Sequence, residues 1–272
     1  MRQSSKHQAV FATAAFAAAL RHMALRFFGM NYSMWTIQAR WALDHHVIRY
    51  NYFEHIPMIT TPVLRLVTGK LTGKVTAPLL VADGRVYDDS WQIVAFADRT
   101  GHREKLSPFD KVDAIREWHD VCDVAKKSNR IIATDATAHN EDAKRDNLPD
   151  FFPEFTRNVL TPLADLGVAY LGMKYDFRHA IIAEEKKKVR EVLNKVRKAL
   201  NGKKFIYEHF TYADITAAAT LEFVRPVADR YVPLKPAIRE VFTQNDLATE
   251  FADLIEWRDQ LYADKRGESC AV

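Results

Sequence analysis

The sequence of 272 residues is poor in cysteine and contains only Cys122 and Cys270. Two cysteines cannot form a disulfide framework or a cysteine-based zinc cluster, so a reducing compartment is the expected setting. A block of like charge is also lacking, because the formal net charge of +4 arises from 27% charged residues of both signs. This balance argues against nucleic acid as a partner, since duplex binding is typical of a clustered basic face.

Long hydrophobic runs and early acidic residues are missing as well. The apolar run over residues 9–20 is too short to span a bilayer, and no other segment is long and apolar enough for a membrane helix. The first acidic residue is Asp44. Residues 1–23, which contain arginine and serine but no acid, have the composition of an organelle presequence or a secretory signal. The alternative is an over-extended start, with translation beginning at Met23. We therefore expect a cytoplasmic protein, or a mitochondrial or other organellar one if residues 1–23 are a presequence.

The hydrophobic pattern divides the remaining chain into two parts. Residues 24–100 show the order strand, helix, strand, helix, strand, strand, helix, and after them only helical patterns follow. The stretch "RTGHREKLSP" differs in composition from both sides and is typical of a linker. The predicted organisation is a leader or mis-extended start (1–23), an α/β domain (24–100), a linker (101–108), an all-helical domain (109–265) and a tail (266–272).

Two features frame the hairpin predicted in "TAPLLVADGRVYDDS". Pro78 opens the first strand, where the missing N–H of proline is tolerated. A cis Ala77-Pro78 peptide would in addition turn the backbone of Ala77 outward, to pair with an extended ligand. Asp89-Ser90 stands at the start of the next helix, where it can cap the helix or bind a carboxylate.

Ser33 stands at the start of the first predicted helix, in "NYSMWTIQAR". Its hydroxyl would lie near the positive end of that helix, where an anion is stabilised. A simple helix cap is the structural alternative for this residue too. In the predicted arrangement Ser33, Ala77-Pro78 and Asp89-Ser90 line one groove.

Taken together, these motifs resemble the soluble glutathione S-transferases. "TAPLLVADGRVYDDSWQIVAFAD" is similar to the family pattern "VPxLxxxxxxxxxSxxIxxYL", and "FTYADITAAATLEFV" is similar to the capping-box motif of the family's helical domain. In the latter, Thr211 and Asp214 have capping-box spacing, with Phe210 and Ile215 at the staple positions. The resemblance covers about residues 24–265. It implies an α/β plus all-α fold, with a thioredoxin-like N-terminal domain and an all-helical C-terminal domain.

The resemblance also implies roles for particular residues. Ser33 matches the catalytic position of the serine- and cysteine-type classes, and Tyr32 is the alternative hydroxyl donor. The residues expected to bind glutathione are Ala77, Pro78, Asp89, Ser90 and Lys74. The residues expected at the electrophile site are Met30, Trp118 and His119. No metal is expected, because the adjacent His45 and His46 point about 100° apart on a helix and cannot chelate easily.

The implied activity is a glutathione S-transferase that activates the thiol of glutathione, its cosubstrate, for attack on a small apolar electrophile. A homodimer and a role in detoxification follow from the same resemblance. Residues 33–36 read "SMWT" and contain no cysteine, so thiol–disulfide exchange through a mixed disulfide is not expected. Two alternatives stay open: a non-catalytic binding or assembly protein of the same fold, and a glutathione-dependent enzyme that cleaves ethers or halides.

Overall fold

The first part of the chain forms a four-stranded mixed sheet with the order β2-β1-β3-β4. The computed structural model describes residues 25–149, 161–175 and 181–272. β1 runs parallel to β2 and antiparallel to β3, and β3 forms a hairpin with β4. The strands are β1 (Leu25–Gly29), β2 (Tyr50–Glu54), β3 (Leu79–Ala82) and β4 (Arg85–Tyr87). This topology confirms the predicted thioredoxin-like arrangement.

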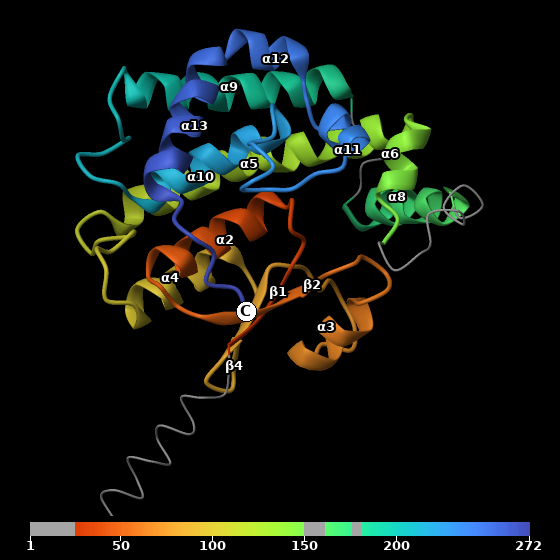
Figure 1. Ribbon diagram of the computed structural model, residues 1–272, viewed down its shortest axis with the longest axis horizontal. Coiled ribbons are helices and arrows are strands. Elements are labelled where there is room, and N and C mark those ends of the chain that lie inside the picture. Colours follow the sequence, from red (N-terminus) through yellow and green to blue (C-terminus); the bar gives the residue numbers. More distant parts are fainter. Residues whose placement is uncertain (1–24, 150–160, 176–180) are drawn as a thin grey trace, which may run out of the picture.

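Three helices cover the two faces of this sheet. They are α2 (Met34–His45), α3 (Thr61–Thr68) and α4 (Ser90–Thr100). α2 and α4 lie between the sheet and the rest of the molecule, whereas α3 lies on the opposite side (Figure 1). The strand sequences explain this layering, because successive side chains of a strand point to opposite faces. Phe27 belongs to the core beneath α2 and α4, and its neighbour Phe28 packs with Leu64 of α3.

The second part of the described chain is helical, as predicted. It contains α5 (Val112–Ala138), α6 (Glu141–Asp146), α8 (Thr161–Tyr175), α9 (Ile182–Leu200), α10 (Tyr212–Thr220), the 3₁₀ turn η1 (Leu221–Phe223), α11 (Pro236–Val241), α12 (Asn245–Glu250) and α13 (Ala252–Lys265). Every residue of α10 is buried, which places this helix in the centre of the molecule.

The start of α10 carries the predicted capping box. The Asp214 carboxylate accepts hydrogen bonds from the backbone N–H of Thr211 at 2.8 Å and of Ile206 at 2.7 Å. Phe210 and Ile215 are buried in the same core cluster, as expected of a hydrophobic staple. The motif therefore fixes both the first turn of α10 and the chain that leads into it.

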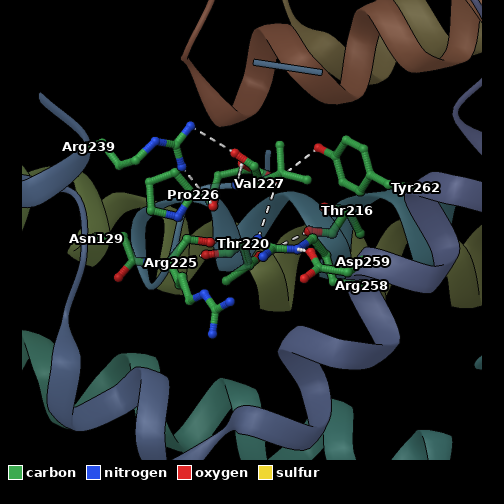
Figure 2. Close-up of polar contacts among 11 residues, drawn as sticks. Asn129, Thr216, Thr220, Arg225, Pro226, Val227, Arg239, Arg258, Asp259 and Tyr262 are labelled. Atoms are coloured by element: carbon green, nitrogen blue, oxygen red, sulfur yellow. Dashed lines mark hydrogen bonds and ion pairs between the residues drawn. The ribbon is translucent and has the colours of Figure 1, made fainter. Parts of the chain in front are cut away.

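α13 holds the loop that follows η1 through buried polar contacts (Figure 2). The Tyr262 hydroxyl donates to Glu222 Oε1 at 2.8 Å, and the N–H of Val227 donates to Glu222 Oε2 at 3.1 Å. Arg258 donates to the carbonyl of Arg225 at 2.7 Å and lies 3.7 Å from the Glu222 carboxylate. Burial raises the pKa of Glu222, and the Arg258 charge acts in the opposite direction. The buried carboxylate is thus matched by donors from two elements.

The last residues return to the sheet, where the C-terminus is marked in Figure 1. Ala271 forms a parallel bridge with Tyr50 at the outer edge of β2. The N–H of Tyr50 donates to the carbonyl of Cys270 at 3.3 Å, and the N–H of Val272 donates to the carbonyl of Tyr50 at 3.0 Å. The segment predicted as a tail therefore covers part of an edge strand, which otherwise presents unpaired backbone groups.

Among the helices that the structure describes, none combines the length and the apolar character needed to cross a bilayer. The leader predicted at residues 1–23 lies outside the described residues.

Candidate functional site

Ser33 occupies the residue before the first turn of α2 without capping it. Its backbone is extended there, with φ −68° and ψ 126°, and its side chain makes no capping hydrogen bond. Its carbonyl accepts from the N–H of Ile37 at 2.8 Å, and its own N–H donates to the carbonyl of Met30 at 2.9 Å. The backbone of Ser33 is thus fixed, but its hydroxyl does not cap α2. Ser33 therefore does not act as the simple helix cap that the sequence offered as an alternative.

Ser33 and Ala77 line one cavity of about 230 Å³ between the two parts of the chain. The Ala77-Pro78 peptide bond is cis, and Ala77 stands just before β3. β3 pairs with β1, and the turn that follows β1 leads to Ser33. The sheet therefore brings two of the predicted site residues together although they are distant in sequence.

The wall of this cavity is largely apolar and comes from several elements. Met30, predicted at the electrophile site, is one of its lining residues. The helical part contributes Phe223 of η1 and Phe242 at the end of α11, whose rings lie 4.2 Å apart. Such a concave, apolar space with a few polar groups is typical of a small-molecule site.

Tyr32 also lines the cavity, and its ring lies 5.5 Å from that of Phe242. Burial raises the pKa of Tyr32, and the charge of Glu54 raises it further. A phenol in this setting stays protonated at neutral pH, so it can donate a hydrogen bond but is not a source of phenolate. Tyr32 remains the alternative hydroxyl donor.

Asp89 and Ser90 lie at the start of α4, and neither is among the residues that line the cavity. Asp89 is exposed and caps the helix, because its Oδ1 accepts from the N–H of Gln92 at 2.9 Å. Ser90 is buried, and its Oγ accepts from Gln38 Nε2 of α2 at 2.7 Å. Asp89 thus caps α4, as the helix-cap alternative predicted. Ser90, by contrast, is hydrogen-bonded to α2, the helix that follows Ser33. Lys74 is exposed in the segment before β3.

Two residues predicted at the electrophile site lie elsewhere. Trp118 packs against the core cluster between α5 and α9. His119 is buried between Trp91 and Tyr212, with both ring distances at 5.8 Å. Burial, with a contribution from the Lys126 charge, lowers the pKa of His119 to about 3. The residues of α5 that line the cavity lie further along that helix than Trp118 and His119, from Arg130 onward.

Comparison with known proteins supports this assignment of the fold. Residues 27–104 match the family model of the glutathione S-transferase N-terminal domain. A glutathione S-transferase structure from Methylobacillus flagellatus KT with glutathione bound is 17% identical, covers 88% of this chain and 95% of its own, and has a TM-score of 0.52. One from Methylobacterium radiotolerans JCM 2831, in complex with glutathione sulfonate, is 15% identical, covers 92% and 98%, and has a TM-score of 0.57.

The chain has the glutathione S-transferase fold. The β-etherase LigF from Sphingobium sp. strain SYK-6 is similar as well, with 16% identity, coverage of 81% of this chain and 99% of its own, and a TM-score of 0.53. No curated protein matches the sequence. The resemblance of the motifs to this family is therefore confirmed at the level of the fold and of the N-terminal domain.

Several residues that line the cavity of this glutathione S-transferase fold were not predicted from the sequence. Arg130 of α5 lines the cavity, and its guanidinium lies 4.9 Å from the centre of the Trp35 ring. The loop of residues 55–59, which follows β2, and part of α8 also reach the cavity. A helical spacing on α5 could have placed Arg130 on the same face as Ala133 and Thr134. Nothing in the local sequence shows that this face meets Trp35.

In the described part of the chain, no three histidine, cysteine or acidic side chains lie close enough together to hold a metal ion.

Proposed function

We propose that the protein binds glutathione across α2, β3 and α4 and activates its thiol for attack on a small apolar electrophile. The observation that carries the proposal is the shared cavity of Ser33 and Ala77, with a Ser33 hydroxyl that does not cap its helix. Ala77 would pair with the peptide backbone, and Ser90 and Asp89 would hold the γ-glutamyl end. Pro78, and Lys74 as the weakest member, complete the proposed binding residues.

Ser33 would act by stabilising the thiolate of glutathione. A free thiol has a pKa of about 8.5, so most of it is protonated at neutral pH. A donated hydroxyl hydrogen bond and the positive end of α2 favour the ionised form and lower that pKa. The thiol releases its proton to water, the sulfur lone pair forms the new S–C bond, and the leaving group departs with the electrons of its bond to carbon.

The proposal is tested by calorimetric titration of glutathione into the purified protein, followed by an assay with a chlorodinitrobenzene. Saturable binding and conjugate formation, with release of chloride, are the expected results. Binding without turnover of any electrophile would favour the non-catalytic alternative. Absence of binding at millimolar glutathione would refute the proposal as a whole.

Ether cleavage is the second candidate, because the similar structures include a β-etherase. A β-aryl ether and a chlorinated aromatic of similar size, assayed in parallel, distinguish the two reactions. Release of a phenol from the ether, with no conjugation of the chloride, would favour this candidate.

The proposal includes a homodimer with a role in detoxification. Light scattering of the purified protein measures the mass in solution, and a mass near twice 31.3 kDa is expected. The cytoplasmic location remains a prediction that imaging of the full chain tests.

A further inference from the structure

Lys126 of α5 is a fully buried cation at the boundary between the two parts of the chain. Its ammonium donates to Gln38 Oε1 at 2.8 Å and to Thr216 Oγ1 at 3.0 Å, and both acceptors are neutral. Within the described ranges, no carboxylate lies at ion-pair distance from it. The nearest acid that acts on it, Asp123, accepts from Trp35 Nε1 at 2.6 Å and pairs with Lys127 at 2.8 Å.

This burial is costly, because removing an ammonium from water carries a penalty of several kcal/mol that neutral acceptors offset only in part. The penalty is visible in the pKa of Lys126, which burial lowers to about 8. The group is still mostly protonated at pH 7. A site that keeps such a cation without an ion-pair partner among the described residues is well suited to an anion that arrives with a ligand.

The second observation is the direction of the hydrogen bonds that start at Lys126. An ammonium only donates, so the carbonyl oxygen of the Gln38 side chain must face Lys126. The amide nitrogen of Gln38 must then face Ser90, where it donates to Oγ at 2.7 Å. Ser90 therefore accepts from Gln38, and its own hydroxyl hydrogen is left to donate. Lys126 thus determines that Ser90 is a donor, which is what a carboxylate requires.

The groups around Ser90 are compatible with a Ser90 hydroxyl that donates its hydrogen. The Tyr212 hydroxyl, which interacts with Ser90 and with His119 at 3.2 Å, belongs to a neutral pair because the pKa of His119 is so low. The Asp89 carboxylate is occupied by Gln92, through its backbone N–H and its side-chain amide, both at 2.9 Å. Neither the neutral Tyr212–His119 pair nor the Asp89 carboxylate, which already accepts from Gln92, therefore requires the Ser90 hydroxyl hydrogen.

We propose that Lys126 is a positioning residue for the γ-glutamyl carboxylate of glutathione, acting through Gln38 and Ser90. The inference rests on the proposed function, since it assigns that carboxylate to Ser90. Lys126 contributes in two ways: it fixes the Gln38 amide so that Ser90 donates, and it places a positive charge behind the carboxylate, in a region of low dielectric constant.

The test compares two ligands that differ only in this carboxylate. The first is S-methylglutathione, whose blocked thiol removes thiol chemistry from the measurement. The second is the same peptide with a γ-aminobutyryl residue in place of γ-glutamyl, which keeps the amine and lacks only the carboxylate. A third peptide that keeps the carboxylate and lacks only the amine serves as reference. The ratio of Kd values for the peptides without and with the carboxylate is measured for each variant.

We expect the unmodified protein to prefer the carboxylate-bearing peptide by about tenfold or more. Lys126→Met should reduce this ratio to about twofold and leave the affinity for the peptide without the carboxylate unchanged. Lys195→Met, which removes an exposed lysine of α9, should leave the ratio as it is. A purely structural role of Lys126 would weaken both peptides alike.

Gln38→Glu provides a second route if Lys126→Met does not fold. This change gives Lys126 a carboxylate partner and removes the amide that donates to Ser90, so the ratio should again fall to about twofold. An unchanged ratio in a folded variant would overturn the inference. If the unmodified protein bound none of the peptides, the proposed function itself would fail, which is a separate and recognisable outcome.

Discussion

Among the described helices that begin after a hydroxyl residue, α2 at Ser33 and α10 at Thr211 use that residue differently. Thr211 belongs to a complete capping box with Asp214, and its surroundings are buried. Ser33 makes no capping bond and lines a cavity. The same residue type at the same position of a helix is thus part of the folding machinery in one case and free for a ligand in the other.

The difference follows from where each helix start lies. The first N–H groups of a helix have no partner within the helix. In the centre of the molecule they must be satisfied by the protein, and at α10 the Thr211 side chain accepts from the backbone N–H of Asp214 as part of the capping box. At the cavity they can be satisfied by water or by an anion, so the Ser33 hydroxyl is not needed for that purpose.

The largest expected effect concerns the start of α10. Asp214→Ala leaves the buried N–H groups of Ile206 and Thr211 without their acceptor, so the free energy of unfolding should fall by about 3 kcal/mol. Turnover per folded molecule should stay unchanged. Urea unfolding at pH 7 measures the first quantity, and an assay corrected for folded fraction measures the second. An unaltered unfolding midpoint would show that the start of α10 does not depend on Asp214 for its stability.

The proton affinity of Asp214 sharpens the same contrast. Burial raises the pKa of its carboxyl to about 6, although the surrounding donors lower it. The folded state therefore holds a proton that the unfolded state has lost between about pH 4 and pH 6. Over this window the stability contributed by the proton is lost as pH rises, by about 2 kcal/mol. Unfolding curves at several pH values should show this slope in the unmodified protein and not in Asp214→Asn; parallel curves would contradict it.

The start of α2 should respond in the opposite manner. Ser33→Ala should lower turnover at least about tenfold, or about 1.4 kcal/mol in the barrier, with glutathione still bound and the melting temperature unchanged. Thr211→Ala, the matched change at α10, should cost about 1 kcal/mol of stability and leave turnover per folded molecule intact. Equal turnover in Ser33→Ala and the unmodified protein would exclude Ser33 and direct attention to Tyr32→Phe.

A smaller effect is expected at the other end of α2, where the C-terminal segment docks. The N–H of Cys270 donates to Asp44 Oδ1 at 2.8 Å, and Ser269 accepts from Arg40 at 3.1 Å. Removal of residues 267–272 keeps the 2.7 Å ion pair of Arg266 with Asp44. The loss should be about 1 kcal/mol of stability, measured by thermal unfolding. A loss of activity larger than this loss of folded protein would mean that the segment also sets the position of Ser33.

The sequence was informative where the signal was local. The hairpin, the cap at Asp89 and the capping box of α10 all lie within a few residues of their own pattern, and the structure has each of them. Side chains on α5 could not be placed in the same way, because their surroundings come from other elements. Lys126 appears in the sequence as one member of a charged pair, yet its partner Gln38 lies 88 positions away. The packing of Trp118 and His119 away from the cavity could not be predicted from the sequence for the same reason.

The sealed contact between Lys126 and Gln38 has a consequence for protein engineering. The thioredoxin-like part and the helical part are not interchangeable modules, because the Lys126 ammonium of the helical part has its full set of hydrogen-bond acceptors only when Gln38 of the thioredoxin-like part is present. A chimera that joined this helical part to another thioredoxin-like domain would bury an ammonium against whatever replaced Gln38. Exchange of domains within this fold should therefore succeed only when both positions are transferred together.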